Sequence, residues 1–474
     1  MLGSAMVFAS QIFLFAFLPA VLLAYYLSGR RLRTLALLLA SYFFYAWGAP
    51  RFVFILLAAT YFDFIIARLI ARQDQPKARR ALLTASVAVN LSLLGYLKYA
   101  VLLNDVMELL WLREPWLQVA LPIGISFFTF HKLSYVIDVY RGTVQPMRRF
   151  ALFALYVAFF PQLIAGPIVR YNQIADQLLQ RSHTLDKFFD GMTRFSFGLG
   201  KKVLIANVLG ATADSILGRH PGLLTAGAGW LAMLCYTFQI YFDFSGYSDM
   251  ALGLGKMFGF TLPENFNQPY ISRSITEFWR RWHMSLSAWF KDYLYIPLGG
   301  NRISPERTYL NLWIVFFLCG LWHGANWTFI FWGCYHGVLL VIERAFLLQR
   351  LERLPAVITV PFTFLLVLIG WVFFRAGSVG QAFALLQVMF SPFAPAAQGA
   401  AAFVDTKVLV ALLAAALLSF HAIFKQAALR LFGRLLLPAG ESVWARGLAG
   451  VTLFIISWSS LAAGSFNPFI YYRF

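Results

Sequence analysis

Two histidines, His323 and His336, interrupt an otherwise apolar and neutral stretch of this sequence, GLWHGANWTFIFWGCYHG at 320–337. An imidazole has an unperturbed pKa of about 6.5, so its neutral form can take a proton from a hydroxyl group near pH 7. Small residues flank His323 and allow a ligand or another helix to approach closely. This residue type in this setting indicates acyl transfer to a hydroxyl.

The spacing of the two histidines argues against a shared role. On one unbroken helix, residues 13 positions apart would differ by about 140° in direction and about 20 Å in height. We therefore expect only one of them to serve chemistry. His323 is the candidate, and for His336, near the end of its apolar segment, we favour a structural role.

Other kinds of catalytic site find little support. No GxSxG, SxxK or HExxH motif occurs, and LGLGK at 252–256 lacks the spacing of a phosphate-binding P-loop. Cys235, Cys319 and Cys334 match no zinc or disulfide pattern, and we interpret them as small core residues. No metal is therefore expected, and phosphoryl chemistry is disfavoured.

The composition identifies the surroundings of these residues. Hydrophobic residues make up 60% of the 474 residues and charged residues only 12%, whereas a soluble domain carries roughly 25% charge. We predict an all-α polytopic membrane protein with about eleven transmembrane helices, because a spanning chain must satisfy its backbone internally. Apolar runs of sufficient length cover 7–27, 50–70, 81–103, 150–168, 357–374, 407–424 and 444–464.

Basic residues give the expected orientation. The net charge of +19 comes from short clusters between apolar runs, which fits the positive-inside rule better than nucleic-acid binding. RRLR at 30–33 and KARR at 77–80 should be cytoplasmic, which places the N-terminus outside. The first run has its basic cluster after it, so we expect a retained span and not a cleaved signal peptide.

Ionisable residues inside apolar sequence concentrate between about 120 and 345. Asp243 and Asp249 lie in YFDFSGYSDMALGLGKMFGF, 241–260. A carboxylate inside a membrane costs roughly 2.5 to 3.5 kcal/mol and therefore needs a partner, a water-filled cavity or a function. Either structural pairing with a nearby Arg or a role in substrate binding is consistent with the sequence.

The segment ENFNQPYISRSITEFWRRWHMSLSAWFKDYLYIPLGGNR, 265–302, is too charged to span and too aromatic for a soluble loop. We expect an interfacial or re-entrant helix that starts at Ser274, with Glu277 completing a capping box. On that helix Trp279 and His283 would share one line. The imidazole of His283 either faces an internal cavity or is solvated.

These motifs together resemble the membrane-bound O-acyltransferase family. The similarity runs through nearly the whole chain and is carried by LPIGISFFTFHKLSYVIDVYRG, FPQLIAGPIVR, QPYISRSITEFWRRWHMSLSAW, KDYLYIPLGGNR and GLWHGANWTFIFWGCYHG, and it is greatest to the alginate-acetylating branch. The resemblance implies one domain over 1–474, a ring of tilted and re-entrant helices around a central tunnel, His323 as the catalytic residue, and His283 as a second residue needed for activity.

The resemblance also implies substrates. We expect acetyl-CoA as donor from the cytoplasm and O-acetylation of alginate or a similar polysaccharide outside the bacterial inner membrane, directly or through a periplasmic acetyltransferase or acetyl-carrier protein, with no bound cofactor. Asn326 or a backbone N–H would stabilise the oxyanion. Asp243, Asp249 and Trp282 are candidates for substrate binding. Candidates for the CoA phosphates are Arg280, Arg281, Lys291 and Arg302.

Two other readings stay open. A transporter would use Asp243, Asp249 and His323 as groups lining a path for an acyl donor or glycan, and a scaffold for polysaccharide export would need no chemistry. His131 and Lys132, within LPIGISFFTFHKLSYVIDVYRG, depart from the alginate-type pattern. Relatives that acetylate peptidoglycan, cellulose or other surface glycans therefore remain alternatives for the acceptor.

Overall fold

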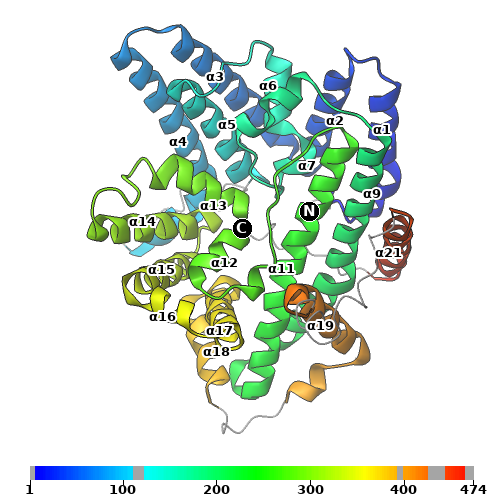
Figure 1. Ribbon diagram of the computed structural model, residues 1–474, viewed down its shortest axis with the longest axis vertical. Coiled ribbons are helices and arrows are strands. Elements are labelled where there is room, and N and C mark those ends of the chain that lie inside the picture. Colours follow the sequence, from blue (N-terminus) through cyan, green and yellow to red (C-terminus); the bar gives the residue numbers. More distant parts are fainter. Residues whose placement is uncertain (1–5, 110–121, 392–398, 425–442, 465–474) are drawn as a thin grey trace. The chain divides into compact units, whose positions relative to one another are not determined.

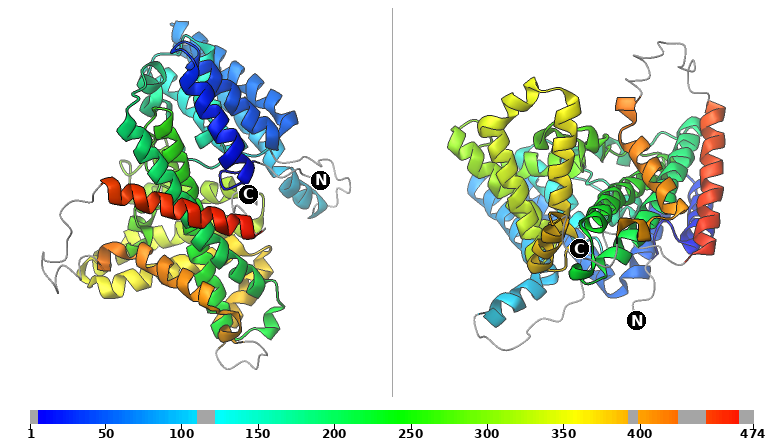
Figure 2. Two further views of the ribbon diagram at one scale, coloured as in Figure 1. Left: turned by 90° about the vertical axis from the view of Figure 1, so that its right-hand side faces the viewer. Right: turned by 90° about the horizontal axis from the view of Figure 1, so that it is seen from below.

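A computed structural model describes residues 6–109, 122–391, 399–424 and 443–464. The regular secondary structure in these ranges is helical (Figures 1 and 2). The predicted all-α membrane architecture is therefore confirmed for the described residues. Five described helices are long and apolar enough to cross a membrane: Pro50–Arg72, Pro76–Ala100, Trp327–Arg353, Ala356–Arg375 and Val443–Ala463. The number of about eleven spans and the central tunnel stay predictions.

The chain forms two compact units, each described here by itself. The N-terminal unit comprises Met1–Phe195 and Tyr247–Pro263, and the C-terminal unit comprises Ser196–Gly246 and Glu264–Phe474. Two long helices, α9 (Leu185–Gly200) and α11 (Ala226–Met257), contribute residues to both units.

In the N-terminal unit, α3, α4 and α5 pack against one another, and α6 packs against α2 and α3. Most of the buried polar side chains of this unit lie on α2, α3, α4 and α5. Its helices are η1 (Phe13–Phe17), α1 (Leu18–Leu27), α2 (Arg33–Gly48), η2 (Pro50–Phe52), α3 (Val53–Arg72), α4 (Pro76–Leu109), α5 (Ile125–Arg141), α6 (Phe150–Ala158), α7 (Phe160–Leu163) and α8 (Tyr171–Leu179).

The apolar run 150–168 does not form the single span expected from its length. It folds as α6 and α7, separated at Phe159, whose ψ of 109° leaves the helical region. Pro161 explains the break, because its ring would clash with the carbonyl four residues back and it has no N–H to continue the ladder. The segment is buried within its unit, so its hydrophobicity reflects protein core.

The C-terminal unit contains His283, between two short helices, and His323 and His336, on one helical hairpin. Its helices are η3 (Lys201–Ala206), α10 (Asn207–Leu217), η4 (Pro221–Leu223), η5 (Pro269–Ile271), α12 (Ile275–Arg281), α13 (Met284–Phe290), η6 (Lys291–Tyr295), α14 (Pro305–His323), α15 (Trp327–Ile342), η7 (Glu343–Leu347), α16 (Leu348–Arg353), α17 (Ala356–Arg375), α18 (Val379–Met389), η8 (Ala400–Phe403), α19 (Thr406–Ser419) and α21 (Val443–Ala463), with the first part of α11.

α14 and α15 form a hairpin (Figure 1), and a glycine on each helix lets the two backbones approach closely. A Cβ atom on Gly320 would meet the carbonyl oxygen of Phe329 and lie 3.1 Å from Cα of Gly333, and a Cβ on Gly333 would meet the carbonyl oxygen of Phe316. The small residues beside His323 therefore let a second helix approach, which is one of the two functions that the sequence allowed.

Candidate active site

His323 is the last residue of α14, and the chain turns away directly after it. Gly324 has an extended backbone (φ −168°, ψ 157°), and α15 begins at Trp327. The imidazole is only 4% exposed. Its ring centroid lies 4.9 Å from that of Trp322, 5.0 Å from that of Trp332 and 5.2 Å from that of Phe374. Aromatic rings therefore fix the position of the imidazole.

The break after His323 corrects the spacing argument based on one unbroken helix. Because α15 folds back along α14, the ring of His336 lies 5.2 Å from Trp332, the same indole that contacts His323. His336 is fully buried and also contacts Trp279 at 5.2 Å. A Cβ on Gly370 of α17 would lie 2.8 Å from its Nε2. This is the packing of a core residue, as expected for His336.

His283 lies between two short helices and not within one. α12 ends at Arg281, α13 begins at Met284, and His283 itself has left-handed backbone angles (φ 44°, ψ 53°). The expected continuous helix, with Trp279 and His283 on one line, is therefore wrong. The His283 ring is fully buried, so the solvated alternative is wrong as well.

Within the described residues neither ring nitrogen of His283 has a hydrogen-bond partner. The residue lies outside the five candidate spans, and burial lowers the pKa of its imidazole to about 3. The ring is therefore neutral at pH 7, with one N–H and one lone pair left for a bound molecule.

His283 and His323, the two histidines that the sequence motifs single out, approach the same indole. The ring centroid of Trp322 is 6.1 Å from that of His283 and 4.9 Å from that of His323. On its other side His283 meets Phe244 of α11 at 4.7 Å. Residues 40 positions apart in the sequence thus converge in one aromatic region of the C-terminal unit.

A buried asparagine that the sequence analysis did not single out holds the His283 segment. The backbone carbonyl of Asn265 accepts from the N–H of Met284 at 2.9 Å, and its Oδ1 accepts from Oγ of Ser285 at 2.8 Å. Nearby, the N–H of Asn267 donates to the carbonyl of Arg281 at 2.9 Å. These bonds flank His283 on both sides. The available signal was an asparagine inside an aromatic segment that cannot span.

Two further contacts set the start of α12. The Ser274 hydroxyl accepts from the N–H of Glu277 at 3.0 Å, as predicted, but the Glu277 carboxylate accepts from Arg273 N–H at 2.8 Å and so leaves the capping box half formed. The second contact comes from Glu343, a buried carboxylate that accepts from the N–H of Thr276 at 2.9 Å and from its hydroxyl at 2.8 Å. Sequence reasoning missed Glu343, although a buried helix start requires acceptors for its free N–H groups.

Trp282, a candidate for substrate binding, and Asn326, a candidate for the oxyanion, have different surroundings. Trp282 is 3% exposed and belongs to an aromatic cluster, with Trp371 at 5.0 Å and Phe266 at 5.1 Å. Asn326 caps α15, because its Oδ1 accepts from the N–H of Thr328 at 3.0 Å and its amide donates to the carbonyl of Gly377 at 3.1 Å. The structure thus gives the Asn326 side chain a capping function, and an oxyanion role stays a prediction.

Both aspartates of α11 have basic partners. The Asp243 carboxylate lies 2.7 Å from Nζ of Lys202 in the C-terminal unit. In the N-terminal unit, Asp249 accepts from Nε of Arg194 at 3.0 Å and from its Nη2 at 2.8 Å. The pairing of Asp249 with Arg194 agrees with the structural alternative, whereas Asp243 pairs with a lysine and not with the expected arginine. Their role in binding substrate stays a prediction.

The candidates for CoA phosphates are mostly at the surface. Arg281 pairs with Glu277 at 2.8 Å and also donates to the carbonyl of Asn267. The other three, Arg280, Lys291 and Arg302, are exposed. Three exposed cations on one segment remain compatible with an anionic ligand.

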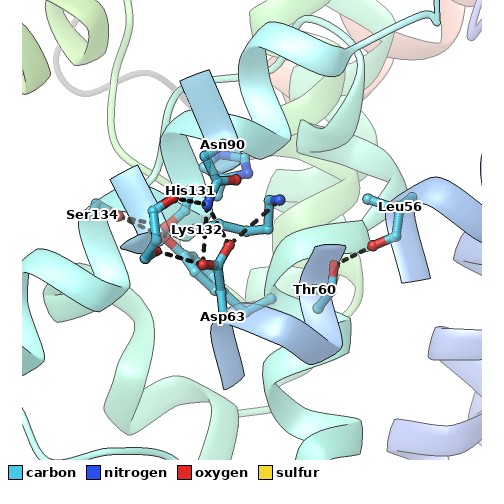
Figure 3. Close-up of polar contacts among 9 residues, drawn as sticks. Leu56, Thr60, Asp63, Asn90, His131, Lys132 and Ser134 are labelled. Atoms are coloured by element: carbon cyan, nitrogen blue, oxygen red, sulfur yellow. Dashed lines mark hydrogen bonds and ion pairs between the residues drawn. The ribbon is translucent and has the colours of Figure 1, made fainter. Parts of the chain in front are cut away.

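A polar cluster outside the candidate site involves Lys132 (Figure 3). Asp63 of α3 accepts from Oγ of Ser86 at 2.6 Å and from Nδ2 of Asn90 at 2.8 Å, and its carboxylate lies 3.4 Å from Nζ of Lys132. All four side chains are buried. The neighbouring ring of His131 lies 5.5 Å from that of Tyr156. The two residues that depart from the alginate-type pattern are thus core residues of the N-terminal unit.

Comparison with known proteins adds a family and several relatives. The model of the membrane-bound O-acyltransferase family matches residues 146–375, which include every candidate site residue. A protein named probable alginate O-acetylase from Pseudomonas putida is 45% identical, over 99% of this chain and 100% of that protein. A namesake from Pseudomonas aeruginosa is 51% identical, over 81% of this chain and 75% of its own length.

A third relative has a different acceptor in its name. The peptidoglycan O-acetyltransferase of Helicobacter pylori is 38% identical to this chain, and the match covers 81% of the chain and 80% of that protein. A match over 81% of the chain is not limited to the two histidine motifs.

Proposed function

This chain belongs to the membrane-bound O-acyltransferase family, and on that premise we propose that it transfers an acetyl group from cytoplasmic acetyl-CoA for O-acetylation of a polysaccharide outside the inner membrane. That it is a membrane-bound acyltransferase follows from the family and its relatives. The donor, the acceptor and the residue roles are our proposal. Two relatives named alginate O-acetylases support alginate or a similar exopolysaccharide as the acceptor.

The convergence of two motif histidines on Trp322 carries the proposal. Their rings come from different elements and lie in a region otherwise built from aromatic side chains. Burying the His283 imidazole there, with no hydrogen-bond partner among the described residues, costs free energy unless it meets a polar group. A substrate that brings a thioester carbonyl into this region would supply one.

In the proposed reaction the acceptor hydroxyl attacks the thioester carbonyl of acetyl-CoA. His323 takes the hydroxyl proton as the new C–O bond forms, and the C–S bond then breaks. The imidazolium returns the proton to the departing thiolate, so the products are an acetyl ester and free CoA. The hydroxyl belongs either to the polysaccharide or to a periplasmic acetyltransferase or carrier protein that passes the acetyl group on.

His283 acts in this scheme as a neutral hydrogen-bonding group. Its unpartnered N–H would donate to the carbonyl oxygen of the thioester, whose negative charge grows in the transition state. The exposed Arg280, Lys291 and Arg302 would bind the CoA phosphates. All of these residues lie on the segment between 280 and 302.

Replacement of His323 tests the proposal. We expect His323→Ala to lower acetyl transfer by about 10² to 10⁴-fold, the usual contribution of a general base, with nearly unchanged expression and unfolding temperature. His336→Gln is the matched control, because this buried imidazole contacts the same Trp332; it should lower stability but keep activity per folded molecule. Full activity in His323→Ala would contradict the proposal.

A second experiment separates direct transfer from an acetyl-histidine intermediate. Purified protein is incubated with labelled acetyl-CoA without acceptor, quenched, and analysed by mass spectrometry of the peptide that contains His323. Direct transfer predicts no labelled adduct. A labelled peptide that disappears on addition of acceptor would replace the direct step with a covalent one.

A further inference from the structure

Two guanidinium groups of the N-terminal unit converge on one buried tyrosine, and neither belongs to the candidate active site. The Arg33 guanidinium lies over the rings of Tyr25 at 5.6 Å and Tyr26 at 5.7 Å. Arg181 donates from Nη1 to the hydroxyl of Tyr25 at 3.2 Å and from Nη2 to Thr34 at 2.9 Å. The two charges thus meet where the end of α1, the start of α2 and the segment before α9 come together (Figure 1).

A histidine and a lysine also lie near this pair. His183 lies 2.9 Å from the Tyr25 hydroxyl, and Lys187 donates to the carbonyl of Gly259 at 2.8 Å. The pKa of His183 is lowered by partial burial and also by the charges of Arg33 and Arg181. The imidazole is therefore uncharged at pH 7, and the lowering agrees with the distances in placing both guanidinium groups near this ring.

No acidic side chain balances the two arginines. Among the described residues no carboxylate lies within ion-pair distance of Arg33 or Arg181, and the nearest ion pair on α9 joins Asp190 to Lys256. Arg33 donates no side-chain hydrogen bond within these residues, and its Nε is buried without a partner. The Tyr25 side chain thus contacts two like charges, which repel each other, and a bound anion would remove that cost.

Exposed leucines continue from this basic pair along both helices. Leu23 and Leu27 are neighbours on one face of α1, with Leu27 83% exposed, and Leu35 and Leu39 are neighbours on α2. In a membrane such faces contact acyl chains. A soluble phosphate compound would gain nothing from them, whereas a phospholipid has both a phosphate and acyl chains.

We propose that this junction binds an anionic phospholipid, with its phosphate held by Arg33 and Arg181 and its acyl chains lying along Leu23, Leu27, Leu35 and Leu39. By the positive-inside rule the junction faces the cytoplasmic leaflet, where anionic headgroups meet basic residues between helices. The site is separate from the chemistry assigned to His323, so it stands or falls independently of the proposed acyl transfer.

Native mass spectrometry of the full-length protein in neutral detergent tests the site. Phosphatidylglycerol or phosphatidylcholine is titrated into delipidated protein, and we expect retained adducts with phosphatidylglycerol only. Arg33→Gln should weaken this binding about fivefold, the equivalent of about 1 kcal/mol for one basic residue near a membrane surface. The double variant Arg33→Gln/Arg181→Gln should weaken it further.

Arg51→Gln is the matched control, since Arg51 is exposed just beyond the opposite end of α2. The affinity of this variant for phosphatidylglycerol should stay unchanged. Because Arg33 makes only ring contacts, its variant should fold even where loss of the Arg181 hydrogen bonds destabilises the protein. Unchanged binding in Arg33→Gln would overturn the proposal. Displacement of the lipid by equimolar CoA would also overturn it and assign the site to donor phosphates.

Discussion

A non-glycine residue in the left-handed region costs about 1 to 2 kcal/mol, and His283 is one of two such residues in the described chain. Its neighbours hold that conformation through the hydrogen bonds of Asn265. Strain that the surrounding structure maintains is often found where a side chain must point in one direction. The backbone at His283 therefore supports the proposal that this imidazole is held in one direction.

Substitution of His283 by two small residues should separate strain from function. His283→Gly and His283→Ala both remove the imidazole and should both reduce acetyl transfer. Glycine adopts positive φ without steric cost, so His283→Gly should be more stable than His283→Ala by about 1 kcal/mol. Unfolding of both variants in detergent measures the difference. Equal stabilities would show that the backbone at this position is not under strain.

At the scale of helices, the segments that break matter more than those that continue. The sequence singled out His323 and His283 as separate candidates, did not predict that their rings converge, and assumed an unbroken helix at each. The signals for breaks were present, because Gly324 and the capping residue Asn326 follow His323 directly. The hydrophobic pattern did not show where the helices end, because aromatic residues lie on both sides of each break and a run of apolar residues gives no signal for a turn.

The Asn265 contacts permit a matched test of how the His283 segment is held. Asn265→Ala removes the acceptor of the Ser285 hydroxyl and should cost about 1 to 3 kcal/mol, because a buried donor loses its partner. It should also reduce acetyl transfer by misplacing His283. Asn267→Ala retains both hydrogen bonds to Arg281, because Asn267 makes them with its backbone N–H and carbonyl. This variant should behave like the unmodified protein. Activity assays with unfolding curves distinguish the two, and equal behaviour would contradict the assignment.

The buried pair of Asp63 and Lys132 should show the cost of an unbalanced charge between helices. Lys132→Met leaves the carboxylate of Asp63 without its cation and should destabilise the protein by about 3 to 5 kcal/mol. Asp63→Asn/Lys132→Met removes both charges while keeping an acceptor for Ser86 and Asn90, so most of the stability should return. Denaturant unfolding in micelles measures both. A double variant no more stable than the single one would refute this account.

At the scale of the whole molecule, composition and basic clusters predicted a helical membrane protein, and the long motifs predicted its family. Neither could predict that 150–168 is core, because a run of apolar residues is equally suited to lipid and to protein interior. The partners of Asp243 and Asp249 were also out of reach. Lys202 and Arg194 lie 41 and 55 positions away in the sequence, and only the folded chain brings them together.

Transfer across the membrane is the prediction that concerns the entire chain. In sealed vesicles with labelled acetyl-CoA on the face that corresponds to the cytoplasm, the label should appear on an acceptor inside while CoA stays outside. A transporter would instead deliver the intact donor. Vesicles that contain His323→Ala are the control and should pass neither species, and intact acetyl-CoA inside the vesicles would support the rival function.

The glycine contact between α14 and α15 has a consequence for turnover. Where two backbones touch, neither helix can shift or rotate along the other without losing that contact, so the backbone that carries His323 at the end of α14 keeps its place relative to α15. In the proposed reaction, donor and acceptor must therefore both reach an imidazole that is carried on a fixed backbone. On the proposed mechanism, we expect the turnover rate to depend on how quickly acetyl-CoA binds and CoA leaves. Faster variants should therefore be sought among residues that control this access.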